Sequence, residues 1–342
     1  MFGGDMFEGG QALRLFALDA TRDFGTHVAR CIGLSLSEHE ERGFEDGEHK
    51  ARPLISVRGA DVYVIQSLHG GPLESVNDKL IRLLFFLAAL RDGAAARVTA
   101  VLPFLAYARK DRRTKSRDPV TTRYLAQLLE AVGVDAVIVL EVHNVVAYQN
   151  AFRCRAEHLD MRRLFAERLR RRLDGAGTAA RPLVVASPDP GGVKRAQLFR
   201  ETLERTLGRP LGSAYLEKRR SAGRVTGDLL AGDVTDATVL LVDDMIASGG
   251  TMLRAARTCL EAGARQVEVL AAHGLFTAGA ETGLRAPELA RVTVTDSIPP
   301  FRLPADLVRD RLEIVSAAPL FGEAILRCHK NSSLVDLIEG ED

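Results

Sequence analysis

The sequence lacks the features that are typical of secreted proteins, of proteins stabilised by bound metal and of nucleic-acid-binding proteins. Its 342 residues carry a formal net charge of +1, so no overall charge draws the chain toward nucleic acid. Lysine is scarce, because the 46 basic residues include only seven lysines and therefore 39 arginines. The four cysteines (Cys31, Cys154, Cys259 and Cys328) form no C-x-x-C pair and show no ligand spacing with histidine. We expect reduced thiols rather than a disulfide framework or a zinc site.

Long apolar runs are missing as well. The longest, around residues 80–90, is interrupted by Arg82 and has about half the length that a membrane span needs. Residues 1–10 lack the basic start and the apolar run of a signal peptide. A cytoplasmic location is the expectation that these absences leave.

The chain does contain a regular alternation of short β-branched runs and longer helical patterns. With 46% apolar and 27% charged residues it has the composition of an ordinary globular protein. The alternation predicts parallel sheets covered by helices. Expected strands are 61–66, 97–103, 136–140, 182–186, 238–243, 266–272 and 292–295, and expected helices are 77–91, 121–132, 192–207 and 251–262.

Two similar α/β halves follow from the length and from this repeated theme. We place the boundary near residue 160, which gives an N-terminal domain of residues 1–160 and a C-terminal domain of residues 161–321. A C-terminal helix at about 322–342 is expected to pack back on the first domain.

A basic segment lies close to this boundary. Residues 161–173 carry six arginines in their last twelve positions. Such a run is compatible with a nucleic-acid or membrane surface, but more often it is the solvated face of a helix. The irregular spacing of the arginines favours the solvated face.

The strongest local signal is VLLVDDMIASGGT at residues 239–251. An apolar strand ends in two aspartates and is followed by a short loop of small residues that opens a helix. At the carboxyl end of a parallel strand, this arrangement turns backbone N–H groups and the helix dipole toward an anion. We expect a phosphate on Ser248, Gly249, Gly250 and Thr251, and sugar hydroxyls on the neighbouring Asp243 and Asp244. The alternative is an ordinary strand-to-helix turn with an acidic strand end.

This loop resembles the one shared by phosphoribosyltransferases and ribose-phosphate diphosphokinases, also called phosphoribosyl diphosphate synthases. Further segments look like the synthase family, in its order, over residues 43–330, whereas a simple phosphoribosyltransferase would have the loop without them. They are GFEDGE (43–48), SVRGADVYVIQS (56–67), NDKL (77–80), RVTAVLPFLAYARKDRR (97–113), DPVTT (118–122), EVH (141–143), SPDPGGVKRA (187–196), KRR (218–220) and AHGLF (272–276).

The resemblance implies a fold, a reaction and partners. The fold is α/β, with two tandem phosphoribosyltransferase-like domains, each a mainly parallel sheet flanked by helices. The reaction moves the β,γ-diphosphoryl group of Mg-ATP to the anomeric hydroxyl of ribose 5-phosphate and gives phosphoribosyl diphosphate and AMP. Mg²⁺ is the implied cofactor. The implied assembly is a homo-oligomer, a dimer or hexamer, in which a neighbouring subunit completes the ATP site, and neither nucleic acid nor a membrane is an expected partner.

The resemblance also assigns catalytic and metal-binding residues. Lys218 and Arg220 would stabilise the transferring diphosphoryl group from a polar segment, residues 217–227, which we expect to be a flexible loop that closes over phosphates. Without the resemblance, these basic residues would be taken for a solvated turn. His143 and Asp189 would hold Mg²⁺ together with the nucleotide phosphates. Each follows an expected strand, where α/β sheets place their ligands.

Nucleotide binding by resemblance involves two segments. The first segment, YARKDR, supplies Arg109, Lys110 and Asp111. The second segment, GFEDGE, supplies Phe44, Asp46 and Glu48, and it would reach the site from a neighbouring subunit. The aromatic ring would stack on adenine and the acidic groups would read its exocyclic amine. The alternatives are that Phe44 is a core residue and Arg109 an ordinary surface residue.

Four positions depart from the family pattern. Aspartate is usual where this chain has Glu141 and Ala247. Glutamine is usual in place of Lys110, and asparagine in place of Asp46. They leave open a different ribosyl or sugar-phosphate acceptor for the same chemistry. A non-catalytic, synthase-associated regulatory protein is the remaining alternative, although such a protein would be expected to lose Lys218 and Arg220.

Overall fold

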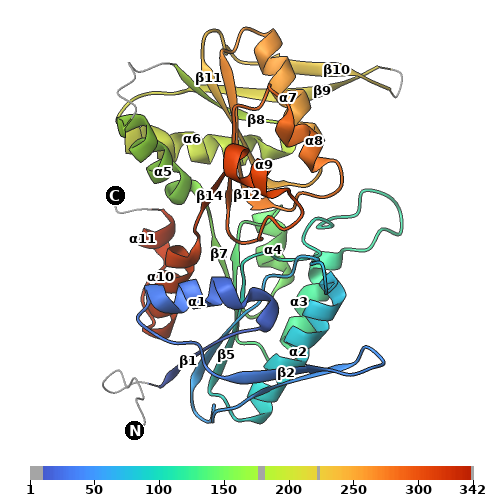
Figure 1. The fold of residues 1–342 in the computed structure, drawn as a ribbon, viewed down its shortest axis with the longest axis vertical. Helices are drawn as coiled ribbons and strands as arrows, with labels where there is room; N and C mark the ends of the chain where they lie inside the picture. The colour runs from blue at the N-terminus through green and yellow to red at the C-terminus, as the bar shows by residue number, and fades with distance from the viewer. Residues whose placement is uncertain (1–10, 176–181, 222–223, 340–342) are drawn as a thin grey trace. The chain divides into compact units, whose positions relative to one another are not determined.

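A computed structural model describes residues 11–175, 182–221 and 224–339 (Figure 1). It divides the chain into two compact units, one formed by residues up to Leu159 together with those from Ala317 onward, and one running from Asp160 to Ser316. Both units contain a mainly parallel sheet with helices on its faces, which confirms the predicted fold class.

Unit 1 contains a five-stranded parallel sheet with the order β1-β4-β5-β6-β7. Its strands are β1 (Leu13–Ala17), β4 (Asp61–Ile65), β5 (Arg97–Leu102), β6 (Ala136–Leu140) and β7 (Arg155–Leu159). Its helices are the 3₁₀ turn η1 (Asp19–Thr21), α1 (Arg22–Cys31), α2 (Val76–Asp92), α3 (Thr121–Ala131), α4 (Val145–Ala151), α10 (Ala318–His329) and α11 (Val335–Ile338).

Burial on both faces explains why the strands of unit 1 are continuous apolar runs. All five residues of β4 are buried, and Val62 and Val64 on one face join the core formed with α2 and α3. On the other side, α1 lies so close to β1 that a Cβ atom at Gly25 would come within 2.2 Å of the Ala17 Cβ atom. Glycine is therefore required at position 25 for this packing.

A two-stranded antiparallel hairpin, β2 (His39–Gly43) and β3 (His49–Pro53), also belongs to unit 1. Its turn is residues 44–48, here called the hairpin tip. The tip is closed by a hydrogen bond from the Phe44 N–H to the Glu48 carbonyl at 2.8 Å, and Gly47 takes the left-handed conformation with φ of +91°. This hairpin was not predicted from the sequence.

Unit 2 contains a seven-stranded sheet with the order β10-β9-β8-β11-β12-β13-β14, in which only the β9–β10 pair is antiparallel among the described residues. The strands are β8 (Leu183–Ser187), β9 (Gly212–Ser221), β10 (Arg224–Ala231), β11 (Thr238–Ile246), β12 (Gln266–Gly274), β13 (Arg291–Thr295) and β14 (Leu312–Val315). The helices are α5 (Arg162–Gly175), η2 (Pro190–Gly192), α6 (Val193–Leu207), α7 (Gly250–Glu261), α8 (Ala280–Arg285) and α9 (Ala305–Arg311).

Strand β11 shows how unit 2 is layered. Val239 and Leu241 point into the core shared with α7, α8 and α9, whereas Leu240 and Val242 point into the core shared with α5 and α6. This alternation follows from the period of two along a strand. It places the carboxyl end of β11, with its two aspartates, at the edge of a rigid, doubly covered sheet.

The prediction of a loop at residues 217–227 was wrong for residues 217–221 and 224–227, whose backbone is strand. This backbone belongs to β9 and β10, and Lys218 pairs with Asp228 and Arg220 with Val225. Strand β9 begins as a parallel neighbour of β8, from Val184↔Gly212 to Ser187↔Tyr215, and then continues past the end of β8. Beyond that point it extends as a two-stranded ribbon with β10.

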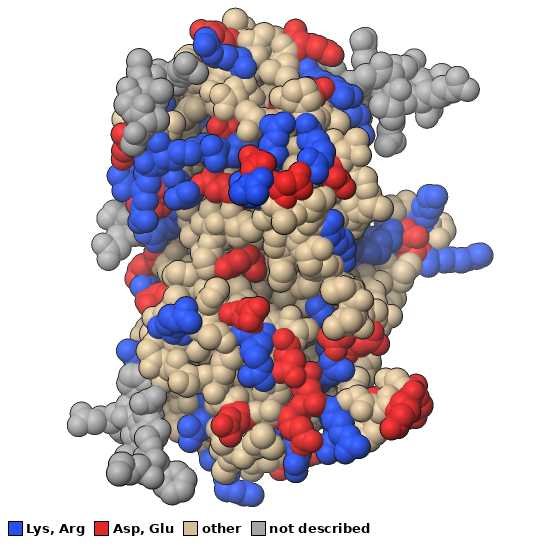
Figure 2. Space-filling view, in the orientation of Figure 1, with Lys and Arg blue, Asp and Glu red and all other residues tan. Residues whose placement is uncertain are grey.

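Helix α5 carries the basic segment, and acidic side chains lie among its arginines (Figure 2). Arg168 and Arg172 pair with Glu313, and Arg170 and Arg171 pair with Glu167. These pairs favour the solvated helix face over a nucleic-acid surface. Within the described ranges, no helix has both the length and the apolar character to cross a membrane.

Candidate active site

The predicted phosphate loop joins β11 to α7. Strand β11 continues two residues past the aspartates to Ile246, and α7 begins at Gly250. Gly249 has a φ of +76°, which an L-residue adopts only at a cost, and it offers no side-chain oxygen to cap α7. The first-turn amides of α7 are thus left for another acceptor, and the partial positive charge at the helix start favours an anion.

Backbone hydrogen bonds from the end of the AHGLF motif and from the residue after it fix the start of the phosphate loop. The N–H groups of Leu275 and Phe276 donate to the Ile246 carbonyl at 2.9 and 3.1 Å, and the Thr277 N–H donates to the Ala247 carbonyl at 3.0 Å. Phe276 is buried, has a φ of +45°, and leaves no room for a Cβ atom at Gly274, which would come within 2.3 Å of its ring. The motif thereby fixes the backbone from which the phosphate loop starts.

Asp243 and Asp244 form an acidic pair at the carboxyl end of β11. Their side chains are 20% and 4% exposed, and the Arg195 Nη1 atom lies 3.4 Å from an oxygen of Asp243 and 3.7 Å from one of Asp244. Burial, and then the neighbouring charge of Asp244, raise the pKa of Asp243 to about 8. Arg195 lies in the first turn of α6 and belongs to the SPDPGGVKRA segment, but it was not among the predicted site residues.

Asp243→Asn is expected to remove a pH dependence of stability. Because folding raises the pKa of Asp243 from 3.8 to about 8, the folded chain keeps a proton that the unfolded chain releases within this window. The contribution of Asp243 to the free energy of unfolding therefore falls as pH rises through the window, and is lost completely only above the folded pKa. Thermal unfolding between pH 5 and pH 9 should show the variant gaining stability relative to wild type as pH rises. A difference that stays constant over this range would contradict this assignment.

Asp189 is held rigidly at the end of β8. Its Oδ1 atom accepts hydrogen bonds from the N–H groups of Gly191 at 2.9 Å and Gly192 at 3.2 Å, while the Ser187 hydroxyl donates to its carbonyl at 2.6 Å. Among the described residues, the Oδ2 atom accepts no hydrogen bond. A fixed carboxylate with one oxygen left for a ligand fits a hard cation such as Mg²⁺.

In unit 1, two loops meet at the carboxyl ends of β5 and β6. The Asn144 Nδ2 atom donates to the Asp111 carboxylate at 2.6 Å, and the Asn144 Oδ1 atom caps α4 by accepting from the Ala147 N–H at 3.1 Å. Asp111 is thus hydrogen-bonded to the loop that carries His143. His143 itself is exposed. In the same loop Glu141 is 5% exposed and has a φ of +38°.

Lys110, one of the departures from the family pattern, is engaged within its own loop. Its ammonium group donates to the Asp118 carboxylate and to the Thr114 hydroxyl. The hydrogen bond from Lys110 is the main cause that lowers the pKa of Asp118 far below its usual range. The added positive charge is therefore balanced locally, while the neighbouring Arg109 is exposed.

The hairpin tip presents the other predicted nucleotide residues to solvent. Phe44 is 40% exposed, which rules out a core position within unit 1, and the guanidinium carbon of Arg42 lies 5.5 Å from the centre of its ring. Asp46 and Glu48 are exposed beside it. Lys218 and Arg220 lie on β9, and their side chains are outside the described part of the structure.

Comparison with known proteins gives matches over nearly the whole chain. Residues 13–133 match the N-terminal domain of ribose phosphate pyrophosphokinase, and residues 221–339 match the phosphoribosyl synthetase-associated domain. The chain is similar to the ribose-phosphate pyrophosphokinase of Caldanaerobacter subterraneus subsp. tengcongensis, with 35% identity over 95% of this chain and 98% of that protein. It is 36% identical to the protein of that name from Gloeobacter violaceus, over 95% of this chain and 93% of the relative.

A solved structure shows the same architecture. The crystal structure of phosphoribosylpyrophosphate synthetase from Mycobacterium smegmatis superimposes with a TM-score of 0.82 and 32% identity, over 94% of this chain and 99% of that chain.

Proposed function

Because the chain belongs to the ribose-phosphate pyrophosphokinase family, a family of enzymes, we propose that it transfers the β,γ-diphosphoryl group of Mg-ATP to ribose 5-phosphate. The observation that carries this proposal for the acceptor is the phosphate loop with its acidic pair at one sheet edge. Helix-start amides suit the 5-phosphate, and carboxylates suit sugar hydroxyls. Full-length relatives named as enzymes argue against a non-catalytic regulatory protein.

The acceptor would bind entirely within unit 2. Its phosphate takes the amides of Ser248, Gly249, Gly250 and Thr251, and its hydroxyls donate to Asp243 and Asp244. Arg195 contributes positive charge that stabilises the ionised form of the acidic pair when the sugar arrives. The side chain at Ala247 is small, so it leaves the backbone approach to the phosphate open.

Nucleotide phosphates would be held by Arg109 and by Mg²⁺, with Asp189 and His143 as the protein ligands of the metal. When bound, Mg²⁺ supplies charge neutralisation at the phosphates. Asp189 is suited to this role because its orientation is already fixed by two backbone amides. Asp111 orients the loop of His143 through Asn144.

The chemical step is a displacement at the β-phosphorus. The anomeric oxygen forms a bond to this phosphorus, and its hydroxyl proton is released to solvent. The bond from this phosphorus to the oxygen that bridges it to the α-phosphate breaks, and AMP leaves with that oxygen. Negative charge spreads over the transferring phosphate oxygens, and Lys218 and Arg220 are proposed to stabilise it. Excluding water from this group prevents its loss to hydrolysis.

An acceptor panel tests the proposed substrate. Purified protein with Mg²⁺ and ATP is given ribose 5-phosphate, other sugar phosphates or ADP-ribose, and AMP release is measured. Ribose 5-phosphate should give the highest kcat/KM. Turnover only with another acceptor would keep the chemistry and replace the substrate, whereas no AMP with any acceptor would favour a regulatory protein.

We further propose that the hairpin tip serves the nucleotide site of a neighbouring copy in a homo-oligomer, and that the protein acts in the cytoplasm. The tip lies on a two-stranded hairpin and exposes an aromatic ring with two acidic side chains, a set suited to an adenine base.

Mixed oligomers are expected to reveal this sharing. Phe44→Ala and Lys218→Ala damage different parts of the site, so co-expressed mixtures contain some sites built from an intact tip and an intact lysine. Activity should therefore recover above that of either variant alone. Recovery that is missing from oligomers shown by mass spectrometry to contain both variants would contradict a tip acting between subunits.

A further inference from the structure

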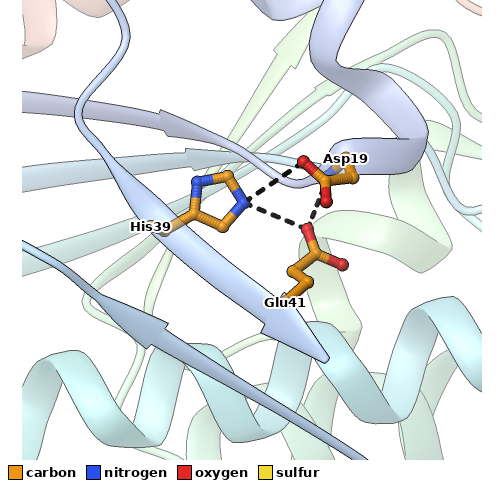
Figure 3. A group of neighbouring side chains, drawn as sticks. All are labelled: Asp19, His39 and Glu41. Carbon is orange, nitrogen blue, oxygen red and sulfur yellow. Dashed lines mark hydrogen bonds and ion pairs between the residues drawn. The ribbon is translucent and has the colours of Figure 1, made fainter. Parts of the chain in front are cut away.

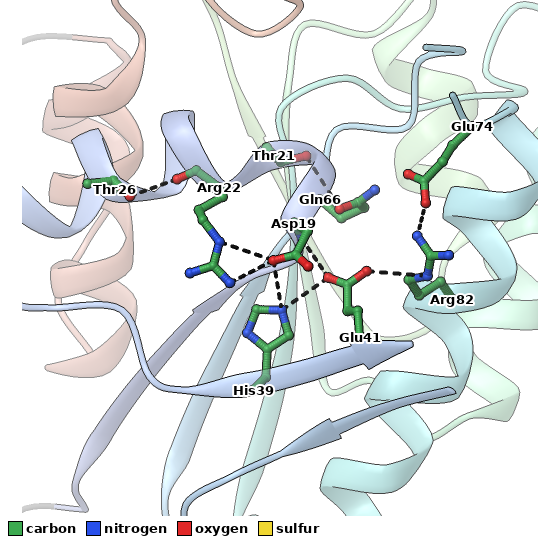
Figure 4. Close-up of polar contacts among 9 residues, drawn as sticks. All are labelled: Asp19, Thr21, Arg22, Thr26, His39, Glu41, Gln66, Glu74 and Arg82. Atoms are coloured by element: carbon green, nitrogen blue, oxygen red, sulfur yellow. Dashed lines mark hydrogen bonds and ion pairs between the residues drawn. The ribbon is translucent and has the colours of Figure 1, made fainter. Parts of the chain in front are cut away.

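A partly buried ion-pair cluster lies at the root of the β2–β3 hairpin, where β2 contacts η1 and α2. Its centre is Glu41 on β2, whose side chain is 6% exposed. One carboxylate oxygen accepts a hydrogen bond from the Asp19 N–H at 2.5 Å and lies 3.0 Å from the His39 Nε2 atom, and the other lies 3.3 Å from the Arg82 Nε atom (Figures 3 and 4). One hairpin side chain therefore contacts both η1 and α2.

The geometry of Asp19, His39 and Glu41 would by itself suit a metal ion, since one ligand atom of each lies within 4.8 Å of the others. The surrounding charges make an ion pair the better account. An Arg22 nitrogen lies 2.6 Å from Asp19, and the Arg82 guanidinium pairs with Glu74 and places its Nε atom 3.3 Å from Glu41, so each carboxylate of the group already has a guanidinium beside it (Figure 4). A divalent cation there would be repelled by both.

His39 adds a packing contact to the same root. Its side chain is only 2% exposed, and its ring meets the Phe16 ring edge-on, with centroids 6.3 Å apart. His39 and Glu41 share one face of β2 because they are two residues apart. This face is thus the one that joins the hairpin to the body of unit 1.

The neighbouring Glu40 also forms ion pairs, but its partners lie within the hairpin. It points to the opposite face of β2 and pairs across the hairpin with Arg52 at 2.6 Å and Lys50 at 3.7 Å, and its side chain is 33% exposed. Both of these partners belong to β3. Glu40 therefore stabilises the hairpin internally, whereas Glu41 connects it to η1 and α2.

We infer that Glu41 is a positioning residue for the nucleotide, acting through the orientation of the hairpin tip. A two-stranded hairpin is only marginally stable alone, so its direction depends on what fixes its root. The tip begins three residues beyond Glu41, which makes the tip sensitive to small rotations there. The inference rests on the proposed function, which assigns ATP to Phe44, Asp46 and Glu48.

The test compares Glu41→Gln with Glu40→Gln, each of which removes one negative charge from β2. Glu41→Gln is expected to raise KM for ATP about tenfold, because a small misplacement of binding groups is costly, while KM for ribose 5-phosphate stays within twofold. Glu40→Gln should leave both constants unchanged. Amide hydrogen exchange over residues 39–53 should be faster in Glu41→Gln than in Glu40→Gln.

Two further variants separate the possible failures. Arg82→Gln removes the partner of Glu41 on α2, together with the ion pair from Arg82 to Glu74, and keeps the inference testable if Glu41→Gln does not fold; it should also raise KM for ATP selectively. If Phe44→Ala raises KM for ATP but both root variants leave it unchanged, the positioning role is wrong and the proposed tip function stands. If Phe44→Ala itself has no effect on KM for ATP, the proposed tip function fails and the inference falls with it.

Discussion

Replacing Lys218 by alanine is expected to lower kcat by about 10³-fold while KM for ribose 5-phosphate changes less than twofold. The reason is that the proposed role of this ammonium group is to stabilise charge that develops only on the transferring diphosphoryl group. The proposed acceptor site uses other residues, so ground-state binding of the sugar phosphate should persist. Initial rates of AMP release at varied ribose 5-phosphate concentration measure both constants.

Lys330→Ala is a matched control for the loss of one lysine, because Lys330 is an exposed residue just after α10 in unit 1. It should leave kcat and KM unchanged. A rise in KM for ribose 5-phosphate as large as the fall in kcat would show that Lys218 binds the acceptor and would overturn the role proposed for it.

The second large effect is expected on stability, from Asp61→Ala. Asp61 is fully buried at the start of β4 and accepts hydrogen bonds from the Arg97 Nε atom at 2.6 Å and the Tyr63 hydroxyl at 3.1 Å. The His329 Nδ1 atom, at the end of α10, lies 2.7 Å from it. Arg97 also donates to the Cys328 carbonyl at 3.0 Å, so the cluster fastens the C-terminal helix to the sheet of unit 1.

Without Asp61, the Arg97 guanidinium would remain largely buried with no carboxylate beside it, since its side chain is only 17% exposed. Loss of one partner of such a pair costs about 3–5 kcal/mol. Burial raises the pKa of Tyr63, so its hydroxyl stays protonated and also loses its acceptor.

Urea unfolding of Asp61→Ala is the measurement, with Asp92→Ala as the control. Asp92 is an exposed residue at the end of α2, and its removal should change the free energy of unfolding by about 0.5 kcal/mol or less. A loss of under about 1 kcal/mol in Asp61→Ala would mean that this cluster does not hold the C-terminal helix.

The buried strands could be predicted because their apolar runs record burial on both faces, as in β6 (AVIVL) and β8 (LVVAS). The β2–β3 hairpin could not. Its strands read HEERG and HKARP, with no apolar alternation, and what stabilises them is cross-strand pairing such as Glu40 with Arg52. The ribbon of β9 and β10 escaped prediction for a similar reason, since it extends from an apolar strand into a basic, glycine-containing segment.

Some contacts of the candidate site also could not be predicted from the sequence. The motif at residues 239–251 located the acidic pair and the loop, because strand, loop and helix start are consecutive in sequence. Arg195 lies far in sequence from Asp243, and Glu41 lies far from Asp19 and Arg82, so these contacts depend on tertiary packing. Lys110 was recognised as a departure, but its pairing with Asp118 became evident only in the structure.

Following the β-phosphorus of ATP tests the central claim most directly. ATP labelled with ³²P at the β position is incubated with the protein, Mg²⁺ and ribose 5-phosphate, and the products are separated. We predict that the label appears in a ribose 5-phosphate derivative carrying a diphosphate at the anomeric carbon, with unlabelled AMP in equal amount. Label that remains in ADP, or that is released as free diphosphate without a sugar product, would contradict diphosphoryl transfer by this chain.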